Sequence, residues 1–212
     1  MNVNEIFYSI QGESSFIGRP SAFIRLAGCD LRCTYCDTEY AFKEGREMSI
    51  PQILAAVSAF PVTLVLVTGG EPMLQPDTGE LLRVLLDGGY TVCLETGGHR
   101  PVQALDPRVH RIMDLKCPSS GMQQHNNYEN IGQLTRKDEI KFVVGTREDF
   151  DWACGMIGRY DLPAKVGVVL FSPVYGALPY ADLARWVLDC GLPVRLQLQM
   201  HKIIWPGILR GV

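Results

Sequence analysis

Seven short runs of apolar and β-branched residues alternate along this chain with stretches of helical character. The runs occupy residues 21–27, 62–67, 90–94, 111–113, 139–144, 165–170 and 194–198. Such alternation is typical of βα units around a parallel sheet. A closed barrel of eight units usually takes about 250 residues, and this chain has 212. We therefore predict an α/β fold, an incomplete and partly open (β/α) barrel formed as a single domain by residues 1–212.

Polar or glycine-rich segments follow the predicted strands. They lie at residues 28–38, 68–72, 95–98, 114–119, 171–174 and 199–202. In βα barrels the active site lies at the carboxyl ends of the strands, so we expect these six segments to meet there. The helical stretches span residues 49–60, 77–86, 147–156 and 179–190. Residues 119–130 are rich in Gln and Asn and predict a mobile loop.

Three cysteines, Cys29, Cys33 and Cys36, lie in the first of these segments with the spacing C-x3-C-x2-C. Thiolates are soft ligands for zinc, copper(I) and iron–sulfur clusters. A structural zinc ion needs four ligands, commonly from two close pairs. Three thiolates on a four-iron cluster would leave one iron open to a small molecule. A zinc knuckle or incidental core cysteines remain the alternatives.

The overall composition argues against a nucleic-acid-binding, membrane-spanning or secreted protein. The formal net charge is −3, whereas nucleic-acid binding calls for a basic surface. No apolar run approaches the ~18 residues of a membrane span, and the first residues lack the regions of a secretory signal. The seven cysteines are not spaced as a disulfide framework. We expect a cytoplasmic protein in a reducing compartment.

Two polar residues flank the cysteines. Arg25 interrupts an apolar strand, where a charge is costly unless it is paired; it either points to solvent or clamps a carboxylate inside the barrel. Thr38 follows Cys36 by two residues. Its hydroxyl suits Mg²⁺, which keeps much of its hydration and few protein ligands; the alternative is a turn-forming Asp-Thr pair.

The cysteine spacing, with an aromatic residue before the third cysteine, resembles the radical S-adenosylmethionine (SAM) superfamily. The segment Gly69-Gly70-Glu71-Pro72, about 35 residues later, is similar to that superfamily's Gly-Gly-Glu-Pro motif. The resemblance implies a [4Fe–4S] cluster on the three cysteines, with SAM on the open iron. It also implies that this second segment holds the amino group of SAM.

Further motifs resemble the 7-carboxy-7-deazaguanine synthase family over nearly the whole chain. They are Ser9–Glu13, Arg25, Cys36-Asp37-Thr38, Thr68–Pro72 and Gln199–Lys202. The resemblance implies conversion of 6-carboxy-5,6,7,8-tetrahydropterin to 7-carboxy-7-deazaguanine with loss of ammonia, in deazapurine (queuosine) biosynthesis. The implied cofactors are SAM, a [4Fe–4S] cluster and Mg²⁺.

The same resemblance assigns individual residues. Thr38 would bind Mg²⁺. The substrate would contact Ile10, Gln11, Gly12, Arg25, Thr68 and Pro206, to which we add His201 because it follows the last strand. SAM would contact Tyr35, Cys36, Asp37, Gly70, Glu71, Lys116, Cys117, Pro118, Ser119, Phe171, Ser172, Pro173 and Val174.

We expect as partners the carboxylated tetrahydropterin, a low-potential electron donor such as flavodoxin or ferredoxin, and a second copy of the chain in a homodimer. No nucleic acid or membrane is expected.

Two other functions remain open. A glycyl-radical enzyme activating enzyme carries the same cysteine spacing but acts on a partner protein. A non-catalytic iron–sulfur or zinc module would not need the Gly69–Glu71 segment beside its cysteines.

The cysteine triplet generates a first prediction. Anaerobic reconstitution should load about four irons per chain. Replacing Cys29, Cys33 and Cys36 together by alanine should abolish this loading, because the cluster then has no protein ligand. Iron and zinc analysis of the anaerobically purified protein measures the outcome, and zinc in place of iron would contradict the cluster assignment.

Overall fold

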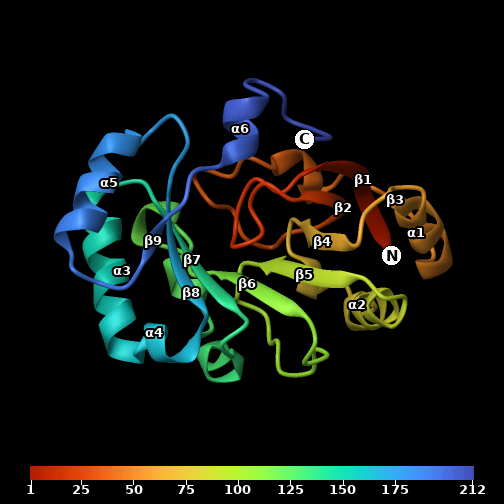
Figure 1. The fold of residues 1–212 in the computed structure, drawn as a ribbon, viewed down its shortest axis with the longest axis horizontal. Coiled ribbons are helices and arrows are strands. Elements are labelled where there is room, and N and C mark those ends of the chain that lie inside the picture. Colours follow the sequence, from red (N-terminus) through yellow and green to blue (C-terminus); the bar gives the residue numbers. More distant parts are fainter.

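A single nine-stranded sheet organises the computed structural model, which describes residues 1–212 (Figure 1). The strand order is β3-β1-β2-β4-β5-β6-β7-β8-β9. The bounds are β1 Asn2–Ile10, β2 Pro20–Leu26, β3 Arg46–Glu47, β4 Leu64–Gly69, β5 Thr91–Thr96, β6 His110–Asp114, β7 Glu139–Val144, β8 Val168–Pro173 and β9 Arg195–Leu196.

The strands β2 and β4 to β9 run parallel to one another and correspond to the seven predicted runs. β1 pairs antiparallel with β2 and with β3, so a short antiparallel ribbon extends one edge. The sheet does not close, because β3 and β9 remain its two edges. The prediction of a partly open barrel is therefore confirmed.

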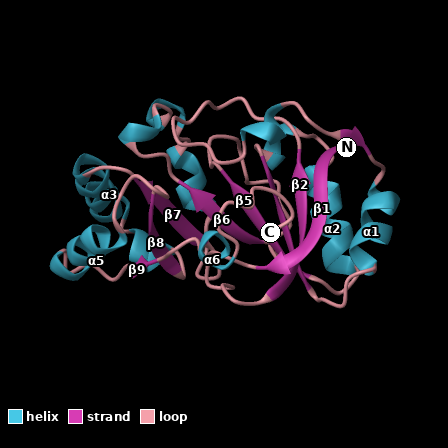
Figure 2. Cartoon of the chain, turned by 90° about the horizontal axis from the view of Figure 1, so that it is seen from above, coloured by secondary structure: helices cyan, strands magenta, loops and turns pink.

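Helices flank the sheet at its two ends, α1 and α2 beside β1 and β2, and α3 and α5 beside β7 to β9 (Figure 2). The bounds are α1 Ile50–Ser58, α2 Thr78–Asp87, α3 Arg147–Tyr160, α4 Leu162–Lys165, α5 Tyr180–Asp189 and α6 Met200–Ile204. Local sequence explains the start of α1: Ser49 and Gln52 form a reciprocal capping box, with Pro51 in the first turn. α3 has 14 residues and is the longest helix. No helix has the length and apolar character to cross a bilayer.

The polar segment 119–130 differs from the predicted loop. Three short 3-10 helices, joined by two-residue connections, cover most of it: Pro118–Ser120, Gln123–His125 and Tyr128–Gln133. The Asn126 side chain accepts from the Lys116 N–H and donates to the Lys116 carbonyl, both at 2.9 Å. The buried Asn130 donates to the carbonyls of Gly98 and Arg100. These side-chain amides supply the hydrogen bonds that the main chain of an irregular segment otherwise lacks. The polar composition of the segment did not predict that these side chains would order it.

Two large apolar clusters hold the helices against the sheet, one under α1 and α2 and the other under α3 and α5. A third, smaller cluster contains Phe7, Phe23, Leu64, Leu66, Cys93 and Ile112. The next residues on the same face of four strands, two positions towards the carboxyl end, are Arg25, Thr68, Glu95 and Asp114. An apolar floor therefore lies directly below a layer of polar side chains.

A buried ion pair joins β6 to the residue before β7. Asp138 is fully buried and accepts from Arg111 Nη2 at 2.6 Å, from Arg111 Nε at 3.1 Å and from the Thr135 N–H at 2.8 Å. Burial alone would raise the pKa of Asp138, but the hydrogen bonds from Arg111 and Thr135 lower it below its ordinary value. The pair therefore stabilises the fold above the unfolded-state pKa of Asp, about 3.9.

Asp138→Ala should reduce the free energy of unfolding at pH 7 by about 3–5 kcal/mol, because it leaves the Arg111 guanidinium buried without a partner. The midpoint of urea unfolding measures the change. The difference from wild type should shrink as the pH falls below about 4 and through the lowered folded-state pKa of Asp138, because protonation of Asp138 then removes the ion pair from the wild-type protein. Arg185→Ala, which removes an exposed pair with Asp182, is the control and should change stability by less than about 1 kcal/mol. Equal midpoints for the two variants would contradict this account.

Candidate active site

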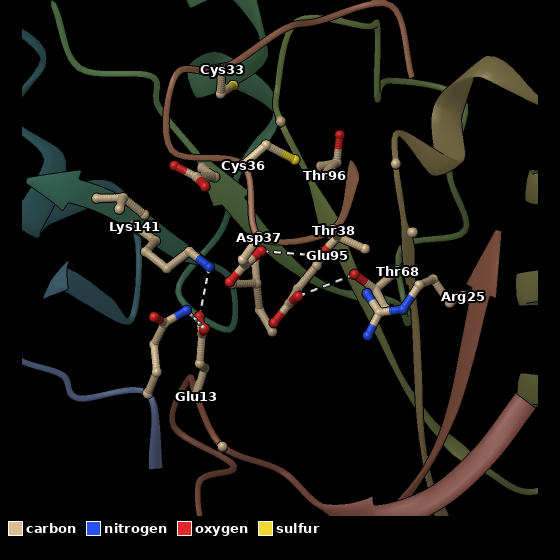
Figure 3. A pocket seen from close by; sticks show the side chains of 18 of the residues that line it. Glu13, Arg25, Cys33, Cys36, Asp37, Thr38, Thr68, Glu95, Thr96 and Lys141 are labelled. Carbon is tan, nitrogen blue, oxygen red and sulfur yellow. Dashed lines mark hydrogen bonds and ion pairs between the residues drawn. The ribbon is translucent and has the colours of Figure 1, made fainter. Parts of the chain in front are cut away.

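One cavity of about 450 Å³ lies at the carboxyl ends of the parallel strands. All six polar segments expected to converge contribute to its wall. Cysteine side chains lie at one end, and Glu13, Lys141, Glu95, Thr68 and Arg25 lie at the other (Figure 3). The cavity therefore joins a sulfur-lined end to a charged end.

The cysteine loop leaves β2 and is held by main-chain contacts. The Gly28 N–H donates to the Ala41 carbonyl at 2.8 Å, and the Cys36 N–H donates to the Cys33 carbonyl at 3.2 Å. Thr34 donates through its N–H to the Ser120 carbonyl and through its hydroxyl to the Ser119 carbonyl. The loop is thus fastened to the 3-10 turn that follows β6.

The three thiols fit the expected cluster. All three are half-buried, unpaired and part of the cavity wall. No three Cys, His, Asp or Glu side chains of the chain are grouped closely enough to hold a single metal ion, whereas the ligand sulfurs of a four-iron cluster bind different irons. Burial raises the pKa of each thiol, so ligation by iron has to displace a proton.

Gly70 packs directly against the start of the cysteine loop. A β-carbon at Gly70 would collide with the carbonyl oxygen of Gly28 and come within 2.8 Å of the Cys29 β-carbon. The Gly70 N–H donates to the Leu26 carbonyl, and the Glu71 N–H donates to the Gly28 carbonyl. The glycine is required because two backbones touch here, in addition to any approach to a ligand.

The Glu71 carboxylate is buried and already bonded within the chain. It accepts from the Met73 N–H at 2.9 Å, the Thr96 hydroxyl at 2.8 Å and the Gly97 N–H at 2.8 Å. The resemblance implied a direct contact with the SAM amino group. In the structure this side chain lines the cavity and also ties the turn after β4 to the end of β5.

Arg25 lines the cavity and does not point to solvent. Its side chain is 14% exposed, and its Nε donates to Glu5 Oε1 at 2.8 Å. Its two terminal nitrogens have no hydrogen-bond partner in the chain. Arg25 pairs in register with Thr68 on β4. The two residues thus form adjacent parts of the wall, and the guanidinium offers its outer edge to a ligand.

Three charged residues, the buried Glu13 and Lys141 and the half-buried Glu95, line the charged end of the cavity. Lys141 Nζ donates to Glu13 Oε2 at 2.6 Å, and Gln199 donates to Glu13 Oε1 at 2.8 Å. Glu95 accepts from the Thr68 hydroxyl at 3.2 Å, while its Oε1 is buried without a partner.

The two carboxylates of this group titrate differently. Burial raises the pKa of Glu95, and the nearby Glu13 charge adds to the effect. Burial also opposes ionisation of Glu13, but the Lys141 ammonium outweighs it and lowers the pKa of Glu13. Two carboxylates with pKa values displaced in opposite directions are a common arrangement for acid–base work.

Thr38 and Asp37 lie on the cavity wall beside Cys36. The Thr38 hydroxyl donates to Asp37 Oδ1 at 3.0 Å, as a turn-forming pair would. Asp37 also forms an ion pair with Lys202. Burial opposes ionisation of Asp37, but the Lys202 charge lowers its pKa below the ordinary range. Thr38 therefore borders the cavity with its oxygen available, and Lys202 supplies a neighbouring positive charge.

Gly12 and His201 meet on the wall of the cavity. A β-carbon at Gly12 would collide with the His201 imidazole, and the Met200 N–H donates to the Gly12 carbonyl at 3.0 Å. Burial lowers the pKa of His201, although Glu13 partly offsets the effect. The first and last motifs of the chain therefore form one edge of the site.

Several predicted SAM-contacting residues lie off the cavity wall. Cys117 and Phe171 pack in the core cluster under α3 and α5. The Ser119 N–H donates to the buried Asp149. The residues concerned are Cys117, Pro118, Ser119, Phe171, Ser172 and Pro173. Pro206, expected at the substrate, is exposed and also off the wall, whereas Val212 lines it.

Several wall residues had no individual role assigned from the sequence, including Glu13, Glu95, His99, Asp114, Lys141 and Val212. Of these, Glu95 and Asp114 lie in segments that were expected to meet here, and Glu13 lies in the Ser9–Glu13 motif. Lys141 interrupts an apolar strand as Arg25 does, so the same argument would have found it. Glu95 lies near the carboxyl end of β5, the end of a strand at which site residues are expected. No local signal marks Val212, which reaches the cavity only through the path of the tail.

The model of the Radical SAM superfamily matches residues 23–174. This span begins in β2 and ends just past β8, so it contains the cysteine loop and most of the cavity wall.

Curated relatives match over the full length. The 7-carboxy-7-deazaguanine synthase of Chlorobaculum tepidum is 49% identical over 100% of this chain and 97% of its own. That of Koribacter versatilis is 42% identical over 100% of both chains.

Among solved structures, QueE from Escherichia coli has the same fold, with a TM-score of 0.76, 24% identity and 94% coverage of each chain. Streptococcus suis SuiB bound to S-adenosylmethionine shares the fold more distantly, with a TM-score of 0.58 and 14% identity over 81% of this chain and 48% of SuiB. With the superfamily match and the full-length relatives, the chain belongs to the 7-carboxy-7-deazaguanine synthase family of the radical SAM superfamily.

Proposed function

We propose that this chain contracts the ring of 6-carboxy-5,6,7,8-tetrahydropterin to 7-carboxy-7-deazaguanine with loss of ammonia, in deazapurine biosynthesis. The observation that carries the proposal is the division of one cavity into a cysteine-lined end and a charged end. A radical enzyme for an anionic pterin needs both ends within reach of each other. The full-length identity to 7-carboxy-7-deazaguanine synthases supports this choice of substrate.

The residues at the sulfur end fit a [4Fe–4S] cluster and SAM, which belong to the chemistry of the superfamily. When bound, these groups supply one-electron chemistry that removes a hydrogen atom from the substrate. Cys29, Cys33 and Cys36 would hold the cluster. SAM would lie along Gly70, with Tyr35, Asp37, Lys116 and Val174 completing its site. Glu71, which also holds the Gly70 turn in place, would contribute to the site of the SAM amino group.

At the charged end, Arg25 would bind the substrate carboxylate through its two free terminal nitrogens, the geometry that guanidinium groups favour. Glu95, whose pKa burial raises, can hold a proton at its unpartnered Oε1 and donate it to a ring nitrogen. Glu13, which Lys141 keeps ionised, can accept from the amino groups of the pterin. Ile10, Gln11, Gly12, Thr68 and His201 would form the remaining substrate contacts.

We further propose that Mg²⁺ binds at the Thr38 hydroxyl, completed by water and by oxygens of the substrate. The neighbouring Asp37 carboxylate, ionised beside Lys202, supports this choice. Thr38 lies on the cavity wall beside Cys36. The ion would therefore bind at the border between the cysteine-lined end and the charged end of the cavity.

A cytoplasmic flavodoxin or ferredoxin would reduce the enzyme, and we propose a homodimer. Exposed Ile17 and Ile203 border a second, apolar cavity beside the edge strand β9. An apolar surface next to an unpaired edge supports association with a second copy.

The proposal is tested by an anaerobic reaction with SAM, a reductant and the carboxylated tetrahydropterin, analysed by mass spectrometry. We expect 7-carboxy-7-deazaguanine to accumulate. No product from cluster-loaded enzyme would overturn the proposal. Formation of a glycyl radical on an added partner protein would favour the activating-enzyme alternative.

Arg25→Ala should raise the KM for the carboxylated pterin by an amount equivalent to about 2–4 kcal/mol, because the substrate carboxylate loses its charged partner. Steady-state kinetics measure the effect. Arg19→Ala removes another arginine of the same part of the chain that does not line the cavity, and it should leave KM unchanged. A wild-type KM for Arg25→Ala would rule out the clamp.

Thr38→Ala should weaken the stimulation of turnover by Mg²⁺, because one ligand of the ion is lost. Turnover is measured against Mg²⁺ concentration, with Thr34→Ala as the control, since Thr34 lies in the same loop and bonds to Ser119 instead. An unchanged Mg²⁺ dependence in Thr38→Ala would exclude Thr38 as a ligand.

A further inference from the structure

Glu5 lies directly across from Arg25, because the two residues are paired in the antiparallel register of β1 and β2. Glu5 Oε1 accepts from Arg25 Nε at 2.8 Å, and the Tyr40 hydroxyl lies 3.1 Å from the same oxygen. Both charged side chains are largely buried, with 17% of Glu5 and 14% of Arg25 exposed. The pair is therefore held in one geometry by the fold.

The other oxygen of Glu5 holds the end of the chain. The Gly211 N–H donates to Glu5 Oε2 at 3.2 Å. The Tyr40 hydroxyl also lies 3.1 Å from the Leu209 carbonyl oxygen, and the Arg210 guanidinium stacks 4.2 Å from the Tyr40 ring centre. Residues 207–212, named here the tail, thus cross the outside of the Glu5–Arg25 pair and bring Val212 to the cavity wall.

These contacts join two features of the site through one carboxylate. With Nε bonded to Glu5, the guanidinium cannot turn freely, and its terminal nitrogens remain free at the cavity. A bidentate carboxylate complex needs that orientation before the ligand arrives. The same carboxylate fixes the tail, so the part of the wall contributed by Val212 depends on it too.

We propose that Glu5 is a positioning residue, which orients Arg25 for the substrate carboxylate and fastens the tail over the same end of the cavity. The proposal rests on the proposed function, because it presumes a carboxylated ligand at Arg25. Its specific consequence is selectivity. Glu5 should matter for a pterin that carries the carboxylate and should matter little for one that lacks it.

The test measures Kd for the carboxylated tetrahydropterin and for tetrahydropterin without the carboxylate, on cluster-loaded, SAM-bound enzyme kept without reductant. Glu5→Ala should weaken binding of the carboxylated ligand by about tenfold, as expected for a disturbed charge-assisted contact. Binding of the other pterin should change by less than about twofold, because it does not use Arg25. Hydrogen exchange of a peptide covering the tail should become faster in the same variant.

The matched control is Glu44→Ala, which removes the exposed ion pair between Glu44 and Arg210 and leaves Arg25 untouched; it should keep wild-type selectivity. If Glu5→Ala does not fold, Glu5→Gln retains the side-chain volume and one acceptor oxygen, and it should reduce selectivity by a smaller factor. Wild-type selectivity in a folded Glu5 variant would overturn the positioning role. Absence of any preference in the wild-type enzyme would instead refute the carboxylate clamp of the proposed function.

Discussion

The site depends on the contact between two backbones, at Gly70 and at Gly28–Cys29. Hydrogen bonds from Gly70 and Glu71 join the ends of β2 and β4, and a side chain at Gly70 would force them apart. Glu71 then ties the same turn to Thr96 at the end of β5. Because the cysteines follow immediately, their position relative to the rest of the cavity is set by main-chain geometry, which is stiffer than a set of side-chain contacts.

Basic side chains inside the central strands are the second constraint, and three of them are paired with a carboxylate. Arg25 bonds to Glu5, Lys141 to Glu13, and Arg111 to Asp138. A buried charge without a partner would be costly, so these partners are a condition of the fold. Two of the pairs border the cavity and leave polar atoms unused there. The ion pairs that stabilise the buried charges therefore also leave polar atoms that can bind a ligand.

The seven parallel strands, the position of the three cysteines at the cavity and the convergence of the polar segments could all be predicted from the sequence, because hydrophobic periodicity and motif spacing are local properties. Lys141 was missed although it interrupts an apolar strand, and Glu95 was expected only as part of the segment that ends its strand. Pro206 and the residues around Phe171 were expected at the site but do not line it. Whether such a residue faces the cavity depends on the pleat of its strand and on the path of the tail, which motif spacing does not specify.

The sequence by itself determined the class of fold, the cysteine triplet and the glycine turn, since each is encoded within a few consecutive residues. Only the tertiary structure decided which charges pair, which carboxylate carries the raised pKa and where the tail crosses the site. Glu5 and Gly211 are separated by 206 positions in the chain and meet because β1 adds to the sheet beside β2. Contacts of that kind follow from the packing of the whole chain, and no local sequence pattern predicts them.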